Sequence, residues 1–289
     1  MHKPLLRCPI CLALLDDADA ARPRCGGGHS FDREGEILRL VSQAHGASLA
    51  AFEAAVRRDR DAAGLDARAF DYPGLPASAA DDPQWRERVA DLAFVRSVRQ
   101  RLGAKTAVDV GAFNGWLSHA LTADGCEVTA LDLFLDPRFG LGARAHYPQR
   151  WRGVQLDVCR PELLASPVDL VVLNHGLHFL PDPMGLVEAW ARRVAPGGAL
   201  LLLGLRLYRD PSARRAEVEA LAARGRSVGV ELFPLAGPGL LTLADGRRLR
   251  AMGMQLWPGR DALANNVLAL ARPRRPLRLR GLWRRRPGR

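Results

Sequence analysis

Residues 106–123 read TAVDVGAFNGWLSHALTA, and this stretch decides the fold. A short apolar strand is expected over residues 106–110 and a helix over residues 116–123. Gly111 and Gly115 bound the turn between them, where glycine lets the backbone turn sharply and approach a ligand closely. A strand that passes through such a turn into a helix is typical of a parallel sheet that binds ligands at the carboxyl ends of its strands.

The same alternation of strand and helix continues outward from this stretch. Further strands are expected over residues 127–131, 154–156, 168–173 and 198–203, with closing strands over 254–257 and 266–270. Helices are expected over residues 184–194, 213–224 and 243–252, the last opened by Thr242. The pattern predicts an α/β protein with a Rossmann-like, doubly wound and mostly parallel seven-stranded sheet, covered on both faces.

The chain before this domain divides into two parts. Residues 1–42 are predicted to be a small zinc-binding module that ends in a short strand. Residues 43–104 are predicted to be a helical linker or cap, with helices over 48–60 and 85–102. The catalytic domain would then span residues 105–271, and residues 272–289 would be a basic, poorly ordered tail.

Composition excludes several classes of protein. Among 289 residues, 48% are apolar and 25% are charged, which is ordinary for a globular protein and excludes disordered, collagen-like and disulfide-dense secreted chains. The longest apolar stretch, residues 197–205, is too short to span a bilayer. Arg7 and Pro9 interrupt the apolar start, so no export signal is expected and a cytoplasmic location is predicted.

The positive charge is concentrated at the end of the chain. The net charge is +11, and nine arginines without any acid follow Ala271, which leaves about 11 − 9 = +2 for the rest. An arginine excess of this kind is weak evidence for nucleic-acid binding.

Cysteine spacing predicts a metal site near the amino terminus. Cys8 and Cys11 form a C-x2-C pair, and Cys25 with His29 forms a C-x3-H pair. Two such pairs can place four ligands around a structural Zn²⁺ ion. The alternative is three ordinary buried thiols and a surface histidine. The remaining thiols, Cys126 and Cys159, lie in apolar contexts and are expected in the core.

Acidic residues follow the second and third strands at the same register. Asp132 ends the second strand and suits a carboxylate that accepts the hydroxyls of a ribose. Asp157 ends the third strand within reach of an adenine edge. Asp109 precedes the glycine turn, where an acid disfavours a phosphate and favours an ammonium or sulfonium.

These residues resemble the class I S-adenosylmethionine-dependent methyltransferases. VDVGAFNG, LDLF and QLDV resemble the first three motifs of that family, VDLVVLNHGLHFLPDP the fourth, and VAPGGALLL the segment before the fifth strand. The resemblance implies that Asp109, Gly111 and Gly115 line the methionine part of the cofactor. It also places Asp132 at the ribose and Asp157 near the adenine. The expected cofactor-binding set is completed by Phe113, Leu133, Val158 and Asn174. Phe113 departs from the family, since many members have glycine there.

The amino-terminal segment resembles a second family. CPIC followed by CGGGHSFDREGEILRL is similar to the zinc module of the ribosomal RNA guanine-N1 methyltransferases. The fourth motif, NHGLHFL, is instead closer to methyltransferases of small molecules, lipids or glycan precursors.

Two histidines follow the fourth strand and are candidate catalytic residues. His175 and His178 are three residues apart and lie at the same sheet edge as the predicted cofactor site. Either could act as a general base toward an acceptor hydroxyl. The alternative is that one caps a strand end and the other is packed. His146 and Tyr147 could also reach the site, although a surface loop is the simpler interpretation.

The leading hypothesis is therefore an enzyme, an S-adenosylmethionine-dependent methyltransferase. It would act on oxygen or nitrogen of a small molecule, lipid or glycan precursor. One alternative is an RNA base methyltransferase that grips RNA with its zinc module and basic tail. Another is a regulatory protein that keeps the cofactor fold without turnover. The oligomeric state stays open.

Overall fold

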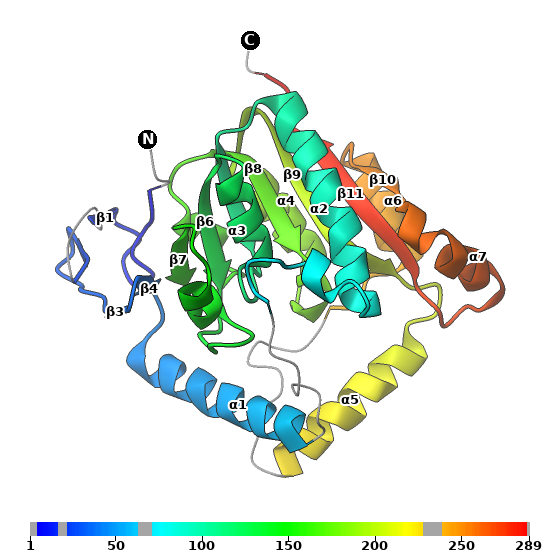
Figure 1. The fold of residues 1–289 in the computed structure, drawn as a ribbon, viewed down its shortest axis with the longest axis horizontal. Helices are drawn as coiled ribbons and strands as arrows, with labels where there is room; N and C mark the ends of the chain where they lie inside the picture. Colours follow the sequence, from blue (N-terminus) through cyan, green and yellow to red (C-terminus); the bar gives the residue numbers. More distant parts are fainter. Residues whose placement is uncertain (1–4, 17–21, 63–70, 228–238, 288–289) are drawn as a thin grey trace.

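The computed structural model describes residues 5–16, 22–62, 71–227 and 239–287. One sheet of nine strands runs through the molecule in the order β10-β11-β9-β8-β5-β6-β7-β4-β3 (Figure 1). The predicted seven strands are therefore too few. The strands are β3 (Arg33–Glu34), β4 (Ile37–Arg39), β5 (Thr106–Val110), β6 (Glu127–Asp132), β7 (Arg152–Gln155), β8 (Val168–Asn174), β9 (Val194–Leu207), β10 (Gln255–Trp257) and β11 (Leu277–Arg284).

The centre of the sheet is parallel and changes direction once. From β5 the chain moves through β6 to β7 on one side, and it then returns to β8 and β9 on the other side of β5. The carboxyl ends of β5 and β8 thus lie beside each other at the point where the strand order reverses. Ligands bind at such a point in open α/β sheets, because the two neighbouring loops lead away in opposite directions and leave a crevice.

Helices cover both faces of the sheet, as the sequence predicts. Helices α2 (Pro83–Leu102) and α3 (Trp116–Ala123) pack on one face, and α4 (Pro183–Ala191) and α6 (Leu243–Ala251) on the other. Alternate residues of β9 enter the two cores: Leu200 and Leu202 enter one, and Leu201 and Leu203 enter the other. The predicted cap of α6 is confirmed, since Thr242 and Asp245 form a capping box.

Short 3-10 helices connect these elements. They are η1 (Ala77–Ala79), η2 (Leu141–His146), η3 (Pro161–Leu163), η4 (Leu177–Phe179) and η5 (Arg260–Ala262).

The amino-terminal segment is joined to the main sheet. Strand β4 pairs in parallel with β7, and β3 follows it at the edge. A separate hairpin of β1 (Leu15–Asp16) and β2 (Arg24–Cys25) packs through Leu15, next to Leu6, into the same core as Leu163. The backbone N–H of Arg7 donates a hydrogen bond to the carbonyl of Leu163 at 2.8 Å. Strands β3 and β4 of the predicted zinc-binding module thus extend the edge of the main sheet.

The carboxyl-terminal segment is a strand, so the prediction of a poorly ordered tail is wrong. Strand β11 lies between β9 and β10 and is antiparallel to both. Its leucines and arginines alternate, which is the period of a strand. Leu279 enters the core, while Arg278 and Arg280 meet the carboxylates of Glu87 and Asp91 on α2. Arg278 and Arg280 therefore have carboxylate partners inside the protein. These two guanidinium groups are thus already paired and are less available to bind RNA phosphates.

The closing strand predicted over residues 266–270 is also wrong, because these residues belong to helix α7 (Leu263–Ala271). A short apolar run does not distinguish strand from helix by its periodicity. The side chains of Asn265 and Asn266 favour the helix, because from it they hydrogen-bond to the backbone of Pro276, next to β11, and of Arg278, within β11.

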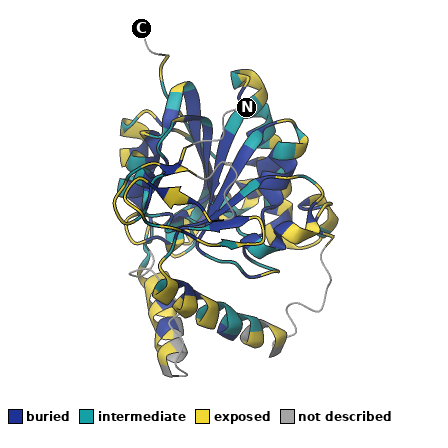
Figure 2. Ribbon diagram, turned by 90° about the vertical axis from the view of Figure 1, so that its left-hand side faces the viewer, coloured by how far each residue is buried: buried dark blue, intermediate teal, exposed yellow. Residues whose placement is uncertain are grey.

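Two helices lie below the main body. Helices α1 (Gln43–Ala62) and α5 (Ser212–Ser227) lie near each other there, and most of their surface is exposed (Figure 2). Within the described part of the chain, no helix combines the length and apolarity needed to cross a membrane.

Candidate functional site

A cavity of about 770 Å³ opens at the carboxyl ends of β5, β6 and β8. Its walls come from three sources: the strand-end loops, the amino-terminal part of α2, and α1. Of the predicted cofactor residues, those that line it are Gly111, Phe113, Asp132, Leu133, Val158 and Asn174. Further apolar and aromatic lining comes from Phe52, Trp85, Trp116, Phe134, Phe139 and Phe179. The cavity is therefore large, and its lining combines these apolar side chains with polar and charged ones, among them Glu53, Arg57, Asp71, Asp82 and Arg88.

The glycine turn has an unusual backbone. Gly111 has a φ of +71°, and Phe113 has a φ of +54°, a left-handed conformation that a non-glycine residue rarely adopts. The substitution of phenylalanine for the family's glycine therefore keeps the backbone shape that glycine would favour. Gly115 does not line the cavity. It caps α3, and the ring of Trp151 occupies the space where a Cβ would lie.

Asp132 lies where a ribose acceptor was predicted. One carboxylate oxygen accepts a hydrogen bond from the backbone N–H of Phe113 at 2.7 Å, and the other from Phe134 at 3.0 Å. Burial raises the pKa of Asp132 to about 6, although these N–H groups oppose the shift. Each oxygen still has a lone pair that can accept a further hydroxyl. The carboxylate is thus fixed and faces the cavity.

Asp109 lies behind the cavity wall. It is fully buried, and its two oxygens accept hydrogen bonds from the Ser118 hydroxyl at 2.7 Å and from Asn174 Nδ2 at 3.1 Å. Burial raises the pKa of Asp109 to about 7. Asn174 is thereby oriented with its amide nitrogen toward Asp109. Its Oδ1 atom is buried and has no hydrogen-bond partner, and the residue lines the cavity.

Asp157 also lies outside the cavity lining. Its carboxylate accepts a hydrogen bond from the backbone N–H of Cys159 at 2.9 Å, which makes it a turn residue after β7. The neighbouring residue, Val158, supplies the cavity wall instead.

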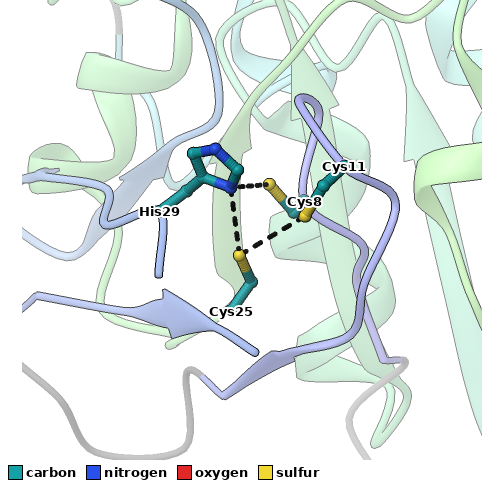
Figure 3. A group of neighbouring side chains, drawn as sticks. All are labelled: Cys8, Cys11, Cys25 and His29. Carbon is teal, nitrogen blue, oxygen red and sulfur yellow. Dashed lines mark hydrogen bonds between the residues drawn. The ribbon is translucent and has the colours of Figure 1, made fainter. Parts of the chain in front are cut away.

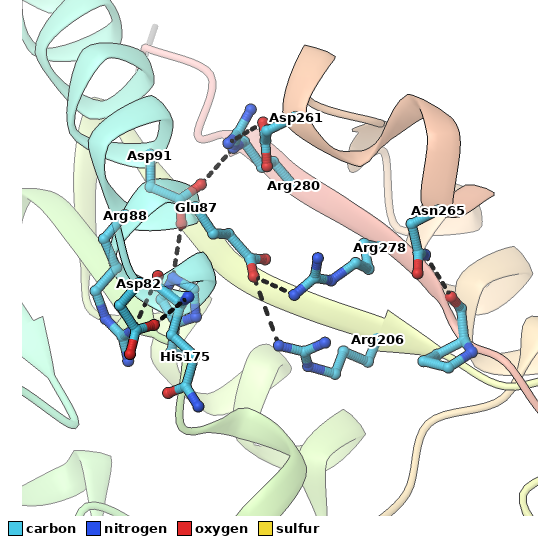
Figure 4. Close-up of polar contacts among 12 residues, drawn as sticks. Asp82, Glu87, Arg88, Asp91, His175, Arg206, Asp261, Asn265, Arg278 and Arg280 are labelled. Carbon is cyan, nitrogen blue, oxygen red and sulfur yellow. Dashed lines mark hydrogen bonds and ion pairs between the residues drawn. The ribbon is translucent and has the colours of Figure 1, made fainter. Parts of the chain in front are cut away.

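His175 lines the cavity but is held by its neighbours. Its Nε2 atom lies 2.6 Å from Asp91 Oδ2, and Asp91 also pairs with Arg280 (Figure 4). Although burial opposes it, the contacts with His175 and Arg280 lower the pKa of Asp91. The ring of His175 fills the space where a Cβ on Gly204 would lie. The contact with Asp91 and the packing beside Gly204 thus hold the ring in place at the cavity wall.

His178 is not among the residues that line the cavity. Burial, together with the charges of Arg206 and His175, lowers the pKa of His178 to about 3, and its ring contacts Phe179. The other predicted candidates are also displaced. Tyr147 is buried against His119, and His146 stacks on Tyr72. The structure therefore brings only His175 of these four residues to the cavity.

Helix α1 contributes residues that sequence reasoning missed. Phe52 stacks on Phe134 with a ring separation of 5.3 Å, and Glu53 accepts hydrogen bonds from the backbone N–H groups of Leu135 and Asp136. Burial raises the pKa of Glu53 to about 7. The helical spacing of Leu49, Phe52 and Val56 was visible in the sequence, but nothing there showed which loop this face would meet.

Arg88 is a second residue that the sequence did not single out. It lines the cavity, and its guanidinium lies 4.8 Å from the centre of the Trp85 ring. Among the described residues no carboxylate forms an ion pair with it, whereas Arg206 and Arg278 share Glu87 nearby (Figure 4). A guanidinium without an anion therefore faces the cavity.

The four predicted zinc ligands come together. The ligand atoms of Cys8, Cys11, Cys25 and His29 all lie within 4.8 Å of one another (Figure 3). The Cys11 and Cys25 sulfurs are 3.6 Å apart, and the Cys25 sulfur lies 3.4 Å from His29 Nδ1. Although burial opposes it, the hydrogen bond with His29 lowers the pKa of Cys25 to about 6. A thiol of this kind is readily deprotonated, which metal binding requires.

Comparison with known sequences agrees with this geometry. Residues 108–202 match the family model described as a methyltransferase domain. The ubiquinone biosynthesis O-methyltransferase of Xylella fastidiosa (strain M23) is 33% identical over 144 residues, which cover 48% of this chain and 54% of the relative. The corresponding protein of Xanthomonas euvesicatoria pv. vesicatoria is 35% identical over 144 residues, 48% of this chain and 56% of the relative. The chain thus spans about half the length of the curated relatives it matches.

Solved structures of methyltransferases are also among the proteins similar to this chain. An O-methyltransferase family protein from Burkholderia thailandensis gives a TM-score of 0.45 at 17% identity, covering 90% of this chain and 79% of that one. The N-methyltransferase NodS from Bradyrhizobium japonicum WM9 gives 0.46 at 16% identity, covering 72% and 99%. The family match thus covers residues 108–202, the part of the chain that runs from β5 to β9, and describes that part as a methyltransferase domain.

Proposed function

We propose that this protein transfers a methyl group from S-adenosylmethionine to an oxygen of a small, largely apolar acceptor. The observation that carries the proposal is the cavity at the reversal of strand order. There, Asp132 and Asn174, with the backbone of Gly111, form a polar wall in a cavity that several aromatic side chains also line. The names of the curated relatives support oxygen as the attacked atom.

The residues at the polar wall fit this cofactor. Asp132 would accept the ribose hydroxyls, and Asn174 Oδ1 would accept a hydrogen bond from the ammonium of the methionine part. Gly111, which has no side chain, lets the backbone lie close to Asn174. Leu133 and Val158 would cover the adenine. Arg88 would hold the carboxylate of the methionine part, because it is the cavity-lining cation that lacks an anion within the described residues.

The cofactor supplies an electrophilic methyl group on a sulfonium. The protein's part is to align the acceptor oxygen with that group and to exclude water, which can provide much of the rate enhancement. The aromatic lining, which includes Phe52, Phe134 and Phe139, favours an apolar or aromatic acceptor over a glycan precursor.

We assign His175 a positioning role. It directly follows β8, and its bond to Asp91 fixes the cap helix α2 over the strand end that carries Asn174. The bonded ring would thereby orient the loop after β8.

The proposal is tested by binding and turnover together. Calorimetry with S-adenosylhomocysteine should give saturable binding, and incubation with S-adenosylmethionine and a panel of phenols and catechols should yield S-adenosylhomocysteine. A natively folded protein that binds neither compound would contradict the proposal. Binding without turnover on any acceptor would favour a regulatory role.

We further propose that Cys8, Cys11, Cys25 and His29 hold a structural Zn²⁺ ion. Zn–S bonds of about 2.3 Å and Zn–N bonds of about 2.0–2.1 Å place tetrahedral ligands roughly 3.5–3.8 Å apart. The Cys11–Cys25 sulfur separation of 3.6 Å and the distance of 3.4 Å from the Cys25 sulfur to His29 Nδ1 are close to this range. Four protein ligands leave no open position for catalysis. The ion would hold the hairpin against the edge of the sheet.

A further inference from the structure

Helix α7 exposes its apolar side to solvent and turns its polar side toward the protein. The residues on its inner side are Asn265, Asn266 and Ala269, and the two asparagines bond to the backbone beside and within β11. The residues on its outer side are all apolar and all exposed: Leu263, Ala264, Val267, Leu268, Leu270 and Ala271. A surface helix normally shows the opposite arrangement, with its apolar stripe toward the core.

The exposure of this outer side is large. The exposed fractions are 51% for Leu263, 67% for Val267, 43% for Leu268 and 63% for Leu270. The helix lies at the periphery of the molecule, on the side away from the amino-terminal hairpin (Figure 1). Contiguous apolar surface of this kind marks an interaction site.

Basic residues outnumber acidic ones around the helix. Arg260 precedes it and Arg272 follows it; both are exposed, and within the described residues neither forms an ion pair. Arg274 also follows and lies 4.0 Å from Asp210. No acidic residue occurs in the chain after Asp261, and Asp261 is itself paired with Arg280 at 2.8 Å.

We propose that α7 docks on an anionic lipid surface, with the outer side of the helix in the interface and the flanking arginines at the headgroups. An apolar stripe flanked by basic residues is the composition of helices that lie in the plane of a membrane. A second copy of this chain is a poorer occupant, because a symmetric contact would bring Arg260 and Arg272 against their own copies. Nucleic acid would neutralise the arginines but leave the leucines in water.

The function that follows is delivery of a membrane-borne acceptor. An apolar acceptor stored in a bilayer has a low concentration in water, so an enzyme held at the surface meets it more often. This inference goes beyond methyl transfer, and it is tested without measuring turnover.

The test is sedimentation of the full chain with vesicles. The wild-type protein should bind vesicles of equal parts phosphatidylcholine and phosphatidylglycerol, and should stay in the supernatant with phosphatidylcholine alone. Replacing two outer residues (V267N with L270Q) should weaken binding about tenfold or more. Replacing two arginines (R260Q with R272Q) should weaken it and reduce its dependence on salt.

Leu14→Gln is the matched control, because Leu14 is 50% exposed but lies on the amino-terminal segment; it should bind like the wild type. Circular dichroism and thermal unfolding of each variant exclude misfolding as the cause. Absence of binding to the anionic vesicles, or unchanged binding by V267N with L270Q, would overturn the proposal. So would a dimer in light scattering that the same two substitutions dissociate, since α7 would then join copies of the chain.

Discussion

Asp91 Oδ2 lies 2.6 Å from His175 Nε2, and this contact links the cap helix α2 to the carboxyl end of β8. The carboxylate is 1% exposed and also pairs with Arg280 of β11. One buried group therefore joins three elements that are far apart in the sequence. Because Asp91 contacts both His175 and Arg280, a change in the position of α2, of the end of β8 or of β11 is expected to affect the other two.

Replacing Asp91 with asparagine should destabilise the protein. The change leaves Arg280 buried without its full complement of charge, and removing one partner of a buried ion pair costs about 3 kcal/mol. Urea unfolding measures the loss. Glu217→Gln is the control, since the Glu217–Arg214 pair is exposed and should contribute less than about 1 kcal/mol. Equal losses in the two variants would show that burial of Asp91 does not matter.

Cofactor affinity should fall as the pH is lowered through about 6. The pKa of Asp132 is raised to about 6, so above that pH the group is a carboxylate that can accept two hydroxyls, and below it the group carries a proton. Titration of S-adenosylhomocysteine between about pH 5 and pH 8 measures the change.

The Asp132→Asn variant separates this effect from other groups. It should bind weakly and with little pH dependence over the same range. Glu53, with a pKa of about 7, also lines the cavity, and Glu53→Gln should keep the midpoint near 6. A midpoint that follows Glu53 instead would remove Asp132 from the ribose role.

Arg88→Gln should weaken S-adenosylhomocysteine binding selectively. A hydrogen bond to a charged group contributes about 1.5–3 kcal/mol, or roughly tenfold and more in affinity. 5′-Methylthioadenosine lacks the amino-acid end, and its affinity should not change. Loss of affinity for both compounds would indicate a general effect on the cavity, and loss for neither would mean that Arg88 does not hold the carboxylate.

Gly204→Ala should displace His175. Its φ of +63° disfavours alanine, and the added Cβ would collide with the imidazole ring. The expected loss is about 2–3 kcal/mol, together with a change in the His175 nuclear magnetic resonance signals. Gly125→Ala is the matched control, because it has a φ of +83° with no atom within 4 Å of a Cβ. The control should lose about 1 kcal/mol and leave His175 unchanged.

Purified protein should contain a single equivalent of zinc. Removing it with a chelator should raise hydrogen exchange in the β1–β2 hairpin and in β4, because these strands depend on the ligand cluster, while β5 and β8 stay protected. Cys25→Ser should lose the metal, and Cys159→Ser should keep it. A protein that lacks zinc in both forms, with an unchanged hairpin, would contradict the assignment.

The centre of the fold could be predicted from local patterns in the sequence. Residues 106–123 encode a strand, a left-handed turn and a helix through local patterning, and the observed β5 and α3 have the predicted bounds. Gly111, Phe113 and Asp132 line the cavity as expected, because strand-end residues of a parallel sheet must meet at one edge. The four predicted zinc ligands also come together as the spacing suggested. Each pair of ligands is separated by only two or three residues, so a local turn is enough to bring its two members close.

Residues whose partners are distant in the chain have roles that no local pattern in the sequence encodes. Asp91 is 84 positions from His175 and 189 from Arg280, and no periodicity connects them. The arginines of β11 suggested a solvated tail until α2 supplied buried carboxylates. The sequence offers His175 as a candidate base, and only the fold shows that its ring is bonded to Asp91 and packed beside Gly204. Local sequence fixes the period of each element, whereas ion pairs and packing depend on which faces the completed fold brings into contact.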